Sequence, residues 1–150
     1  MPIDPAYKQL IDQLHSLQGD ALRKAERKAL TASGDLIEAA LIEAAPEQAG
    51  VPEGLLKPGE LKASIKASVR IASDAKVADT GKGSYVLIRP TDSTARTVAG
   101  WVEHGHNGPR SDSRKTPAHP FIRPTEDATL PEAIETYTTI MTEEITKVLE

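Results

Sequence analysis

Apolar residues recur at helical spacing along the first third of the chain. The stripe begins at Leu10 and runs to Ala44, with Gly19 as a possible helix stop and Asp20 as a possible N-cap of the next helical segment. Residues three and four positions apart share one face of a helix. Gly34 lies inside the stripe, where a glycine costs about 1 kcal/mol relative to alanine. The pattern predicts a helical N-terminal part over residues 1–45, with one long helix that bends near Gly34.

A breaker-rich connector and a small sheet follow in the pattern. Prolines and glycines crowd residues 46–59 and exclude a regular element there. After one helical turn over residues 59–65, alternation over residues 69–72 predicts a strand. Residues 84–89 and 97–103 predict two further strands. The short connections between them favour an antiparallel meander of three to four strands over parallel crossovers.

The last third of the chain predicts a loop followed by an amphipathic helix. Residues 104–120 are rich in glycine, proline, serine and charge, and we expect this long segment to be a mobile loop. Apolar positions within residues 134–148 fall on one helical face, and Thr129 and Glu132 are spaced as a capping box around Pro131. The predicted fold is therefore α+β in a single domain of 150 residues. It consists of a long N-terminal helix, a small antiparallel β-meander and a C-terminal amphipathic helix.

Composition narrows the classes of partner. The chain has 22 acidic and 18 basic residues and a formal charge of −4, which disfavours sequence-specific nucleic-acid binding. It has no cysteine, which excludes disulfides and thiolate sites. No apolar run approaches the ~20 residues that cross a bilayer, so we expect a soluble protein made in the cytoplasm, without a membrane partner. The acidic excess lies in the C-terminal helix, whose carboxylates are expected on the faces away from its apolar side; an ordinary solvated helix surface explains them, and repulsion of DNA phosphates is the alternative.

Candidate catalytic and metal-binding patterns are weak. His104, His106 and His119 could surround a metal ion, but their spacing matches no ligand signature, and solvated loop histidines explain them more simply. Residues 79–81 read Asp-Thr-Gly, as in aspartic proteases, yet a polar turn follows, which indicates a hairpin loop. Residues 81–84 lack the earlier glycine of a phosphate-binding loop. We predict no catalytic, metal-binding or cofactor-binding residue.

A few residues are candidates for structural roles. The chain has one Trp, three Tyr and one Phe, so each aromatic is expected to anchor a contact. Trp101 and Phe121 are expected to hold the two ends of the loop, with Phe121 packed on the sheet or the C-terminal helix. Glu60 and Glu103 stand beside apolar residues, where a carboxylate needs a hydrogen-bonding or charged partner. For Glu103, a solvent-facing strand position is an equal alternative.

Two short patterns beside the predicted loop carry a resemblance to a known family. Residues 98–105 read Val-Ala-Gly-Trp-Val-Glu-His-Gly, and residues 117–124 read Pro-Ala-His-Pro-Phe-Ile-Arg-Pro. With the long helix, connector and meander, this layout resembles the small neck or tail-completion proteins of long-tailed bacteriophages, the gene-product-ten family of HK97-type phages. His104 stands where this family commonly has an aromatic residue, and Thr125 where alanine is common. The residues that match the family pattern are Glu103, Gly105, Pro120, Phe121 and Pro124.

The resemblance implies a non-enzymatic phage protein that assembles. It implies a ring of about six copies at the junction between the DNA-filled head and the tail. The implied partners are other copies of the chain, the head connector, and tail-tube or tail-terminator proteins. The implied location is the neck or tail of the virion, with assembly in the host cytoplasm. The candidate assembly or structural residues are Glu60, Leu61, Trp101, Glu103, Gly105, Pro120, Phe121, Arg123 and Pro124.

Two other functional classes stay open at this point. One is a metal-dependent enzyme that uses His104, His106 and His119, which would need the three imidazoles to converge. The other is a cytoplasmic protein-interaction module, which would share the solubility and the lack of catalytic motifs.

Overall fold

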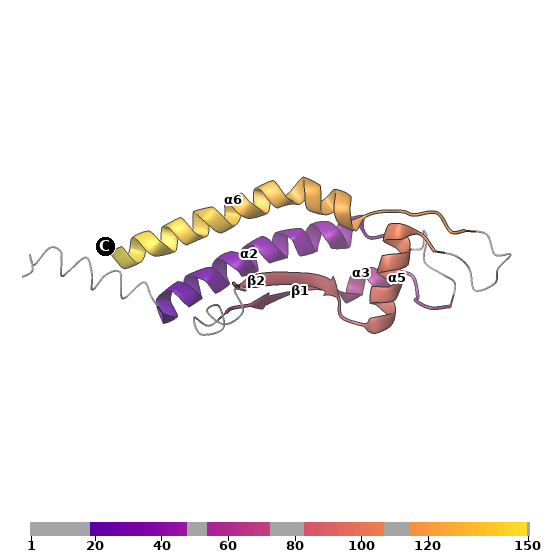
Figure 1. The fold of residues 1–150 in the computed structure, drawn as a ribbon, viewed down its shortest axis with the longest axis horizontal. Coiled ribbons are helices and arrows are strands. Elements are labelled where there is room, and N and C mark those ends of the chain that lie inside the picture. The colour runs from indigo at the N-terminus through magenta and orange to yellow at the C-terminus, as the bar shows by residue number, and fades with distance from the viewer. Residues whose placement is uncertain (1–18, 48–53, 73–82, 107–114, 150) are drawn as a thin grey trace, which may run out of the picture.

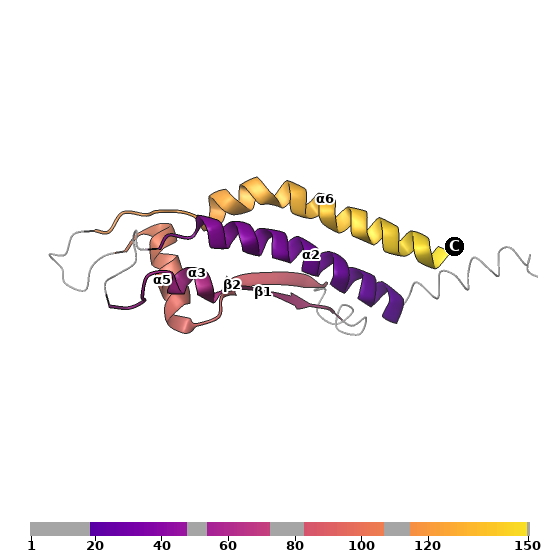
Figure 2. The same cartoon turned by 180° about the vertical axis from the view of Figure 1, so that it is seen from behind.

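The computed structural model describes residues 19–47, 54–72, 83–106 and 115–149. Their elements, in chain order, are α2 (Asp20–Ala44), α3 (Glu60–Ser64), β1 (Ile65–Arg70), β2 (Tyr85–Pro90), α5 (Ser93–His104) and α6 (Ile122–Leu149). Helix α2 forms the middle layer, with α6 along one side and the β1–β2 hairpin along the other (Figures 1 and 2). The short α3 and α5 lie at the end of this stack where α6 begins. The predicted α+β class, with long helices toward both ends, is confirmed.

Helix α2 runs from Asp20 to Ala44 without interruption at Gly34. Gly19 is its N-cap residue, so the predicted boundary is confirmed, although Asp20 is the first helical residue and not the cap. The earlier part of the predicted helix, residues 1–18, lies outside the described residues. Gly34 lets the hairpin approach, because a Cβ atom there would stand 2.7 Å from Cγ2 of Val86 and 3.6 Å from Cβ of Ala67. This glycine therefore serves close packing of helix and sheet.

Adding a methyl group at Gly34 should destabilise the protein. The side chain of Val86 is stiff about χ1, so Gly34→Ala is expected to lower the free energy of unfolding by about 1–3 kcal/mol through overpacking. Gly100 in α5 is the matched control, because no atom of another element lies within 4 Å of the position that a Cβ atom would take there. Gly100→Ala should raise the stability by about 0.5–1 kcal/mol through helix propensity. Urea unfolding checks both values, and a destabilising Gly34→Ala in a Val86→Ala background would contradict the packing account.

The hairpin pairs β1 and β2 antiparallel, with Ile65 opposite Pro90 and Arg70 opposite Tyr85. Burial alternates along both strands, and the more buried positions face α2. One edge N–H, that of Ala67, donates to the carboxylate of Glu38 on α2, so a side chain occupies a donor that an open sheet edge would expose. Strand β2 confirms the strand predicted over residues 84–89. Strand β1 begins earlier than predicted, at Ile65, and overlaps the predicted strand over residues 69–72 only at Val69 and Arg70. Residues 73–82, with their Asp-Thr-Gly letters, lie outside the described part of the chain.

The predicted strand over residues 97–103 is wrong, because this segment belongs to helix α5. The Asp92 side chain caps the helix by accepting a hydrogen bond of 3.0 Å from the N–H of Ala95. The buried residues Ala95, Val98, Ala99 and Val102 recur at helical spacing. Accordingly, the described residues form a sheet of two strands and not of three to four.

Helix α6 begins at Ile122 and contains Pro131, so the predicted capping box is also wrong. The Thr129 hydroxyl instead donates to the Thr125 carbonyl inside the helix, at 2.8 Å. Ile134, which the pattern places on the apolar face, is 56% exposed, whereas Ala133 is buried. None of the helices within the described residues has the length and apolar character of a membrane-spanning segment.

An ion-pair cluster joins α2 to α6 at the far end from α5. The Lys28 ammonium lies 2.7 Å from a carboxylate oxygen of Glu144, and Lys147 lies 2.9 Å from the same oxygen. Hydrogen bonds from these two lysines hold the pKa of Glu144 at about 2. Glu144 therefore stays ionised across the physiological pH range and links α6 to α2 at their surface.

The hydrophobic core cluster lies where α2, α3, β1, α5 and the start of α6 meet. Leu61, Val98 and Val102 have the largest fully buried side chains, and Phe121 is also buried. Partly buried residues, including Trp101 and Ile122, pack against this cluster. The core thus holds the junction between α5 and α6, where the two sequence patterns of interest meet. Its buried members are Leu41, Ala45, Leu61, Ile65, Ala95, Val98, Ala99, Val102 and Phe121.

Candidate functional site: the junction of α5 and α6

The carboxylate of Glu103 caps the N-terminus of α6. One oxygen accepts hydrogen bonds from the backbone N–H groups of Phe121 and Ile122, both at 2.8 Å, and the other accepts from Arg123 at 3.1 Å. Glu103 lies in the last turn of α5, and only 9% of its surface is exposed. A single acidic side chain therefore ties together two helices that are separated by a loop. The expectation that Glu103 needs a hydrogen-bonding partner is confirmed, although it lies on a helix and not on a strand.

The donors of the first turn of α6 are all accounted for. A helix leaves its first N–H groups without partners inside the helix. Glu103 accepts three such bonds, Pro124 has no N–H to satisfy, and the N–H of Thr125 donates to the Phe121 carbonyl at 3.3 Å. Glu103 of the first sequence pattern and Pro124 of the second together leave no unpaired N–H group in the first turn of α6.

The environment of Glu103 favours its ionised form. Burial alone would raise the pKa of this carboxyl group, but the hydrogen bonds from Ile122, Arg123 and Phe121 outweigh it and hold the pKa below its usual value. The positive end of the α6 macrodipole acts in the same direction. The capping interaction is therefore present throughout the neutral pH range.

The lowered pKa predicts how the stability depends on pH. A carboxyl group with a depressed folded-state pKa stabilises the protein fully above its unfolded value of 4.5, and this contribution is lost as the pH falls through the folded-state pKa. The difference in unfolding free energy between wild type and Glu103→Gln should therefore be constant between pH 6 and pH 8 and shrink below about pH 4.5. Denaturant unfolding at a series of pH values tests this, and a difference that grows on acidification would contradict it.

Gly105 ends α5 in a conformation that favours glycine. Its φ is +74°, and a Cβ atom there would stand 2.7 Å from the Thr116 carbonyl oxygen and 3.0 Å from the Ala118 nitrogen. Immediately after it, His106 and Thr116 exchange two backbone hydrogen bonds, of 3.2 and 2.9 Å. The two ends of the predicted loop over residues 104–120 are thus joined. Residues 107–114 lie outside the described residues.

Trp101 and Phe121 hold opposite sides of this junction. The indole ring of Trp101 stacks on the His106 imidazole, with centroids 5.1 Å apart and planes 24° apart. On the return path, the N–H of His119 donates to the Val102 carbonyl at 2.7 Å, two residues before Phe121 enters the core. The loop therefore leaves and re-enters the fold along α5.

The remaining candidate residues differ in their placement. Leu61 is part of the core, whereas Glu60 is exposed and accepts one hydrogen bond of 2.8 Å from the Lys57 N–H. The expected hydrogen-bonding partner of Glu60 is thus present, although the side chain is exposed and not part of the core. Pro120, Arg123 and Pro124 are exposed beside the α6 cap. The contacts of Glu38, Lys28 and Glu144 could not be predicted from the sequence. Each of these side chains binds a group on an element that is distant along the chain.

The three histidines do not converge. His104 and His119 are exposed, and His106 is half-buried against Trp101. In the described part of the chain, no group of three or more His, Cys, Asp and Glu residues could hold a metal ion.

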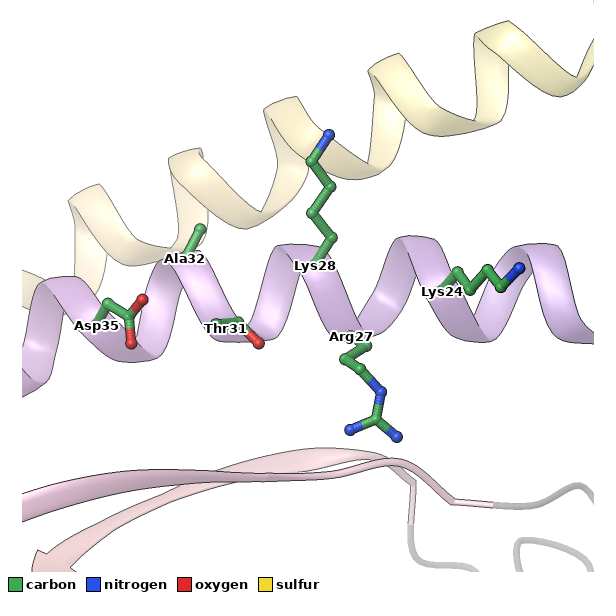
Figure 3. A pocket seen from close by; sticks show the side chains of 6 residues that line it. All are labelled: Lys24, Arg27, Lys28, Thr31, Ala32 and Asp35. Atoms are coloured by element: carbon green, nitrogen blue, oxygen red, sulfur yellow. The ribbon is translucent and has the colours of Figure 1, made fainter.

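A shallow basic groove of about 490 Å³ follows one side of α2. Figure 3 shows Lys28 extending toward α6 and Arg27 toward the hairpin, with Thr31 and Asp35 further along the helix. All the lining residues come from this single helix, namely Lys24, Arg27, Lys28, Thr31, Ala32 and Asp35. The groove is an open, charged helix face and offers no nucleophile paired with a general base.

Comparison with known proteins assigns the family. The family model described as "Bacteriophage HK97-gp10, putative tail-component" matches residues 8–105, about two thirds of the chain. The chain belongs to this family. The HK97-gp10 match includes Glu103 and Gly105 and ends before the segment that contains Phe121. No curated protein and no solved structure matches the chain.

Membership of the HK97-gp10 family supports a structural role in a bacteriophage tail and a location in the virion. Proteins of such tail-component families are generally not enzymes.

Proposed function

We propose that this protein is a neck or tail-completion protein that joins the phage tail to the head connector. In this role it forms a ring of about six copies at the head–tail junction, made from head-to-tail contacts between identical chains. Its other partners are the connector and the tail-tube or tail-terminator proteins. It works without a cofactor, and it acts in the virion after assembly in the host cytoplasm.

The observation that carries this proposal is the family match, together with the use that the chain makes of the matching residues. Glu103 and Gly105 are engaged in internal contacts that hold α5 against the start of α6. These contacts fix the relative positions of the two helices. Two helices tied together in this way suit an assembly protein, because rigid scaffolds commonly position binding surfaces.

The experiment is to delete the gene from the phage or prophage that encodes the chain and to examine the lysate by electron microscopy. The proposal predicts DNA-filled heads and separate tails, with joined particles restored when the wild-type chain is supplied from a plasmid. A Glu103→Leu chain should restore fewer joined particles than wild type. Infectious, joined particles without the chain would overturn the proposal.

A further inference from the structure

The outer face of the hairpin is cationic and partly apolar. Alternation places Lys66 and Arg70 of β1 and Arg89 of β2 on the side of the sheet away from α2, where all three are exposed. Neither strand contains an acidic residue. Lys66 lies directly opposite Arg89 in the register, and like charges in that arrangement destabilise a sheet. Lys66 has Glu38 at 3.4 Å, whereas Arg70 and Arg89 form no ion pair within the described residues.

Apolar side chains lie among these cations. Tyr85 is 50% exposed and stands opposite Arg70, and Leu87 is 38% exposed and stands opposite Ser68. An apolar centre with a charged rim is the usual composition of a protein–protein interface. This face therefore has the features of a surface that another protein covers.

The outer face of α6 has the opposite charge. Glu132, Glu135 and Glu143 are exposed and form no ion pair within the described residues. The hydroxyls of Thr138, Thr142 and Thr146 each donate at 2.8 Å to the carbonyl four residues earlier. Their hydrogen-bonding capacity is thus partly used within the helix, which leaves a less polar surface between the carboxylates. Two large apolar residues of this helix, Leu130 and Ile134, are exposed.

The two charged faces point in opposite directions. Helix α2 separates α6 from the hairpin in both views, so the outer faces of one chain cannot meet each other (Figures 1 and 2). Two copies, however, can bring the hairpin of one against α6 of the other. When two different surfaces of identical chains form a contact, each pair still has one free surface of each kind. Further copies can therefore add, and the assembly continues into a ring or a filament.

We propose that the outer face of the β1–β2 hairpin of one copy docks on the outer face of α6 of a second copy. In this contact, Arg70 and Arg89 lie against Glu132 and Glu135, and Tyr85 and Leu87 cover the threonine surface. The occupant is a second copy because the chain itself supplies the complementary charge, and charge complementarity fixes partner choice and register. The inference deepens the proposed function by naming the surfaces that close the ring, and it rests on that function for the ring itself.

Charge reversal on both faces tests the contact. One variant is Arg70→Glu with Arg89→Glu, which leaves Lys66 in place beside Glu38. The other is Glu132→Lys with Glu135→Lys, which leaves the ion pairs around Glu144 intact. Each variant alone brings like charges together and should associate about tenfold or more weakly than wild type. An equal mixture of the two should recover association, because each altered face meets its complement on the other chain.

The measurement is sedimentation velocity over a hundredfold range of concentration, with circular dichroism to confirm that each variant is folded. The matched control is Lys24→Glu with Arg27→Glu, which makes the same charge change in the α2 groove of Figure 3 and should associate like wild type. The proposal is overturned if the reversed variants associate normally, if the mixture fails to recover, or if the control is weakened equally. A wild-type chain that stays monomeric at every concentration also overturns it.

Two further outcomes separate this inference from its alternatives. The first outcome is that the wild-type chain binds duplex DNA and the variant Arg70→Glu with Arg89→Glu does not, while both self-associate equally. This result would assign the hairpin face to DNA and overturn the proposed contact. The proposed function is tested on particles, so it can fail or hold independently. If the gene deletion still gave joined particles while the mixture of the two variants recovered self-association, the contact would stand and the neck role would be wrong.

Discussion

Replacing Glu103 with leucine is expected to lower the free energy of unfolding by about 3–5 kcal/mol. The substitution removes the acceptor of three backbone hydrogen bonds at a buried helix N-terminus. The N–H groups of Phe121 and Ile122 would be left near the core without their partner, and each unsatisfied buried donor costs about 1–3 kcal/mol. Urea unfolding followed by circular dichroism measures the change.

Glu60→Leu is the matched control for this prediction. Glu60 is a carboxylate in the first turn of α3, where it is exposed and accepts a single hydrogen bond from the Lys57 N–H. Its replacement should change the stability by less than about 1 kcal/mol. Equal effects of the two substitutions would show that Glu103 contributes no more than an ordinary surface carboxylate, and the account of the α5–α6 junction would be wrong.

Phe121→Ala is expected to cost about 3–5 kcal/mol of stability, as is typical for truncating a buried aromatic residue. Phe121 packs into the main core cluster, and its backbone N–H donates to Glu103, so the side chain also positions the start of α6. Thermal and urea unfolding measure the loss.

The comparison for Phe121 is Tyr85→Ala. Tyr85 is half exposed on the hairpin face, and its truncation should cost about 1 kcal/mol or less while weakening self-association. If Phe121→Ala left the stability unchanged and abolished assembly, Phe121 would face a partner and not the core. An unchanged stability together with unchanged assembly would show that this residue anchors nothing.

The periodicity of apolar residues predicts helices and strands that have one face turned toward the core. The apolar stripe of α2 and the alternation of the hairpin can both be recognised in the sequence, because one face of each element is less exposed than the other. Residues 97–103 resemble a strand when taken alone, although Asp92 and the spacing of Ala95, Val98 and Val102 carry the signal of a capped helix. A short apolar run is compatible with both a strand and a helix, and a helix cap before it indicates the helix.

The start of α6 cannot be predicted from the residues next to it in the sequence. Its capping carboxylate comes from Glu103, 19 residues before Ile122, whereas the spacing of Thr129 and Glu132 imitates a local capping box. The sequence does indicate that Glu103 needs a partner, because a carboxylate beside apolar residues is costly when unpaired. It cannot show which donors satisfy it, nor that the charges of α6 and the hairpin lie on opposite sides of α2. Both depend on how distant segments pack.

Counting the copies of the chain in purified virions tests the central claim most directly. Quantitative mass spectrometry of gradient-purified particles, calibrated against labelled peptides of this chain, gives the number per virion. The neck role predicts a fixed number of about six copies, retained through further purification. Absence of the chain from infectious particles would contradict the account.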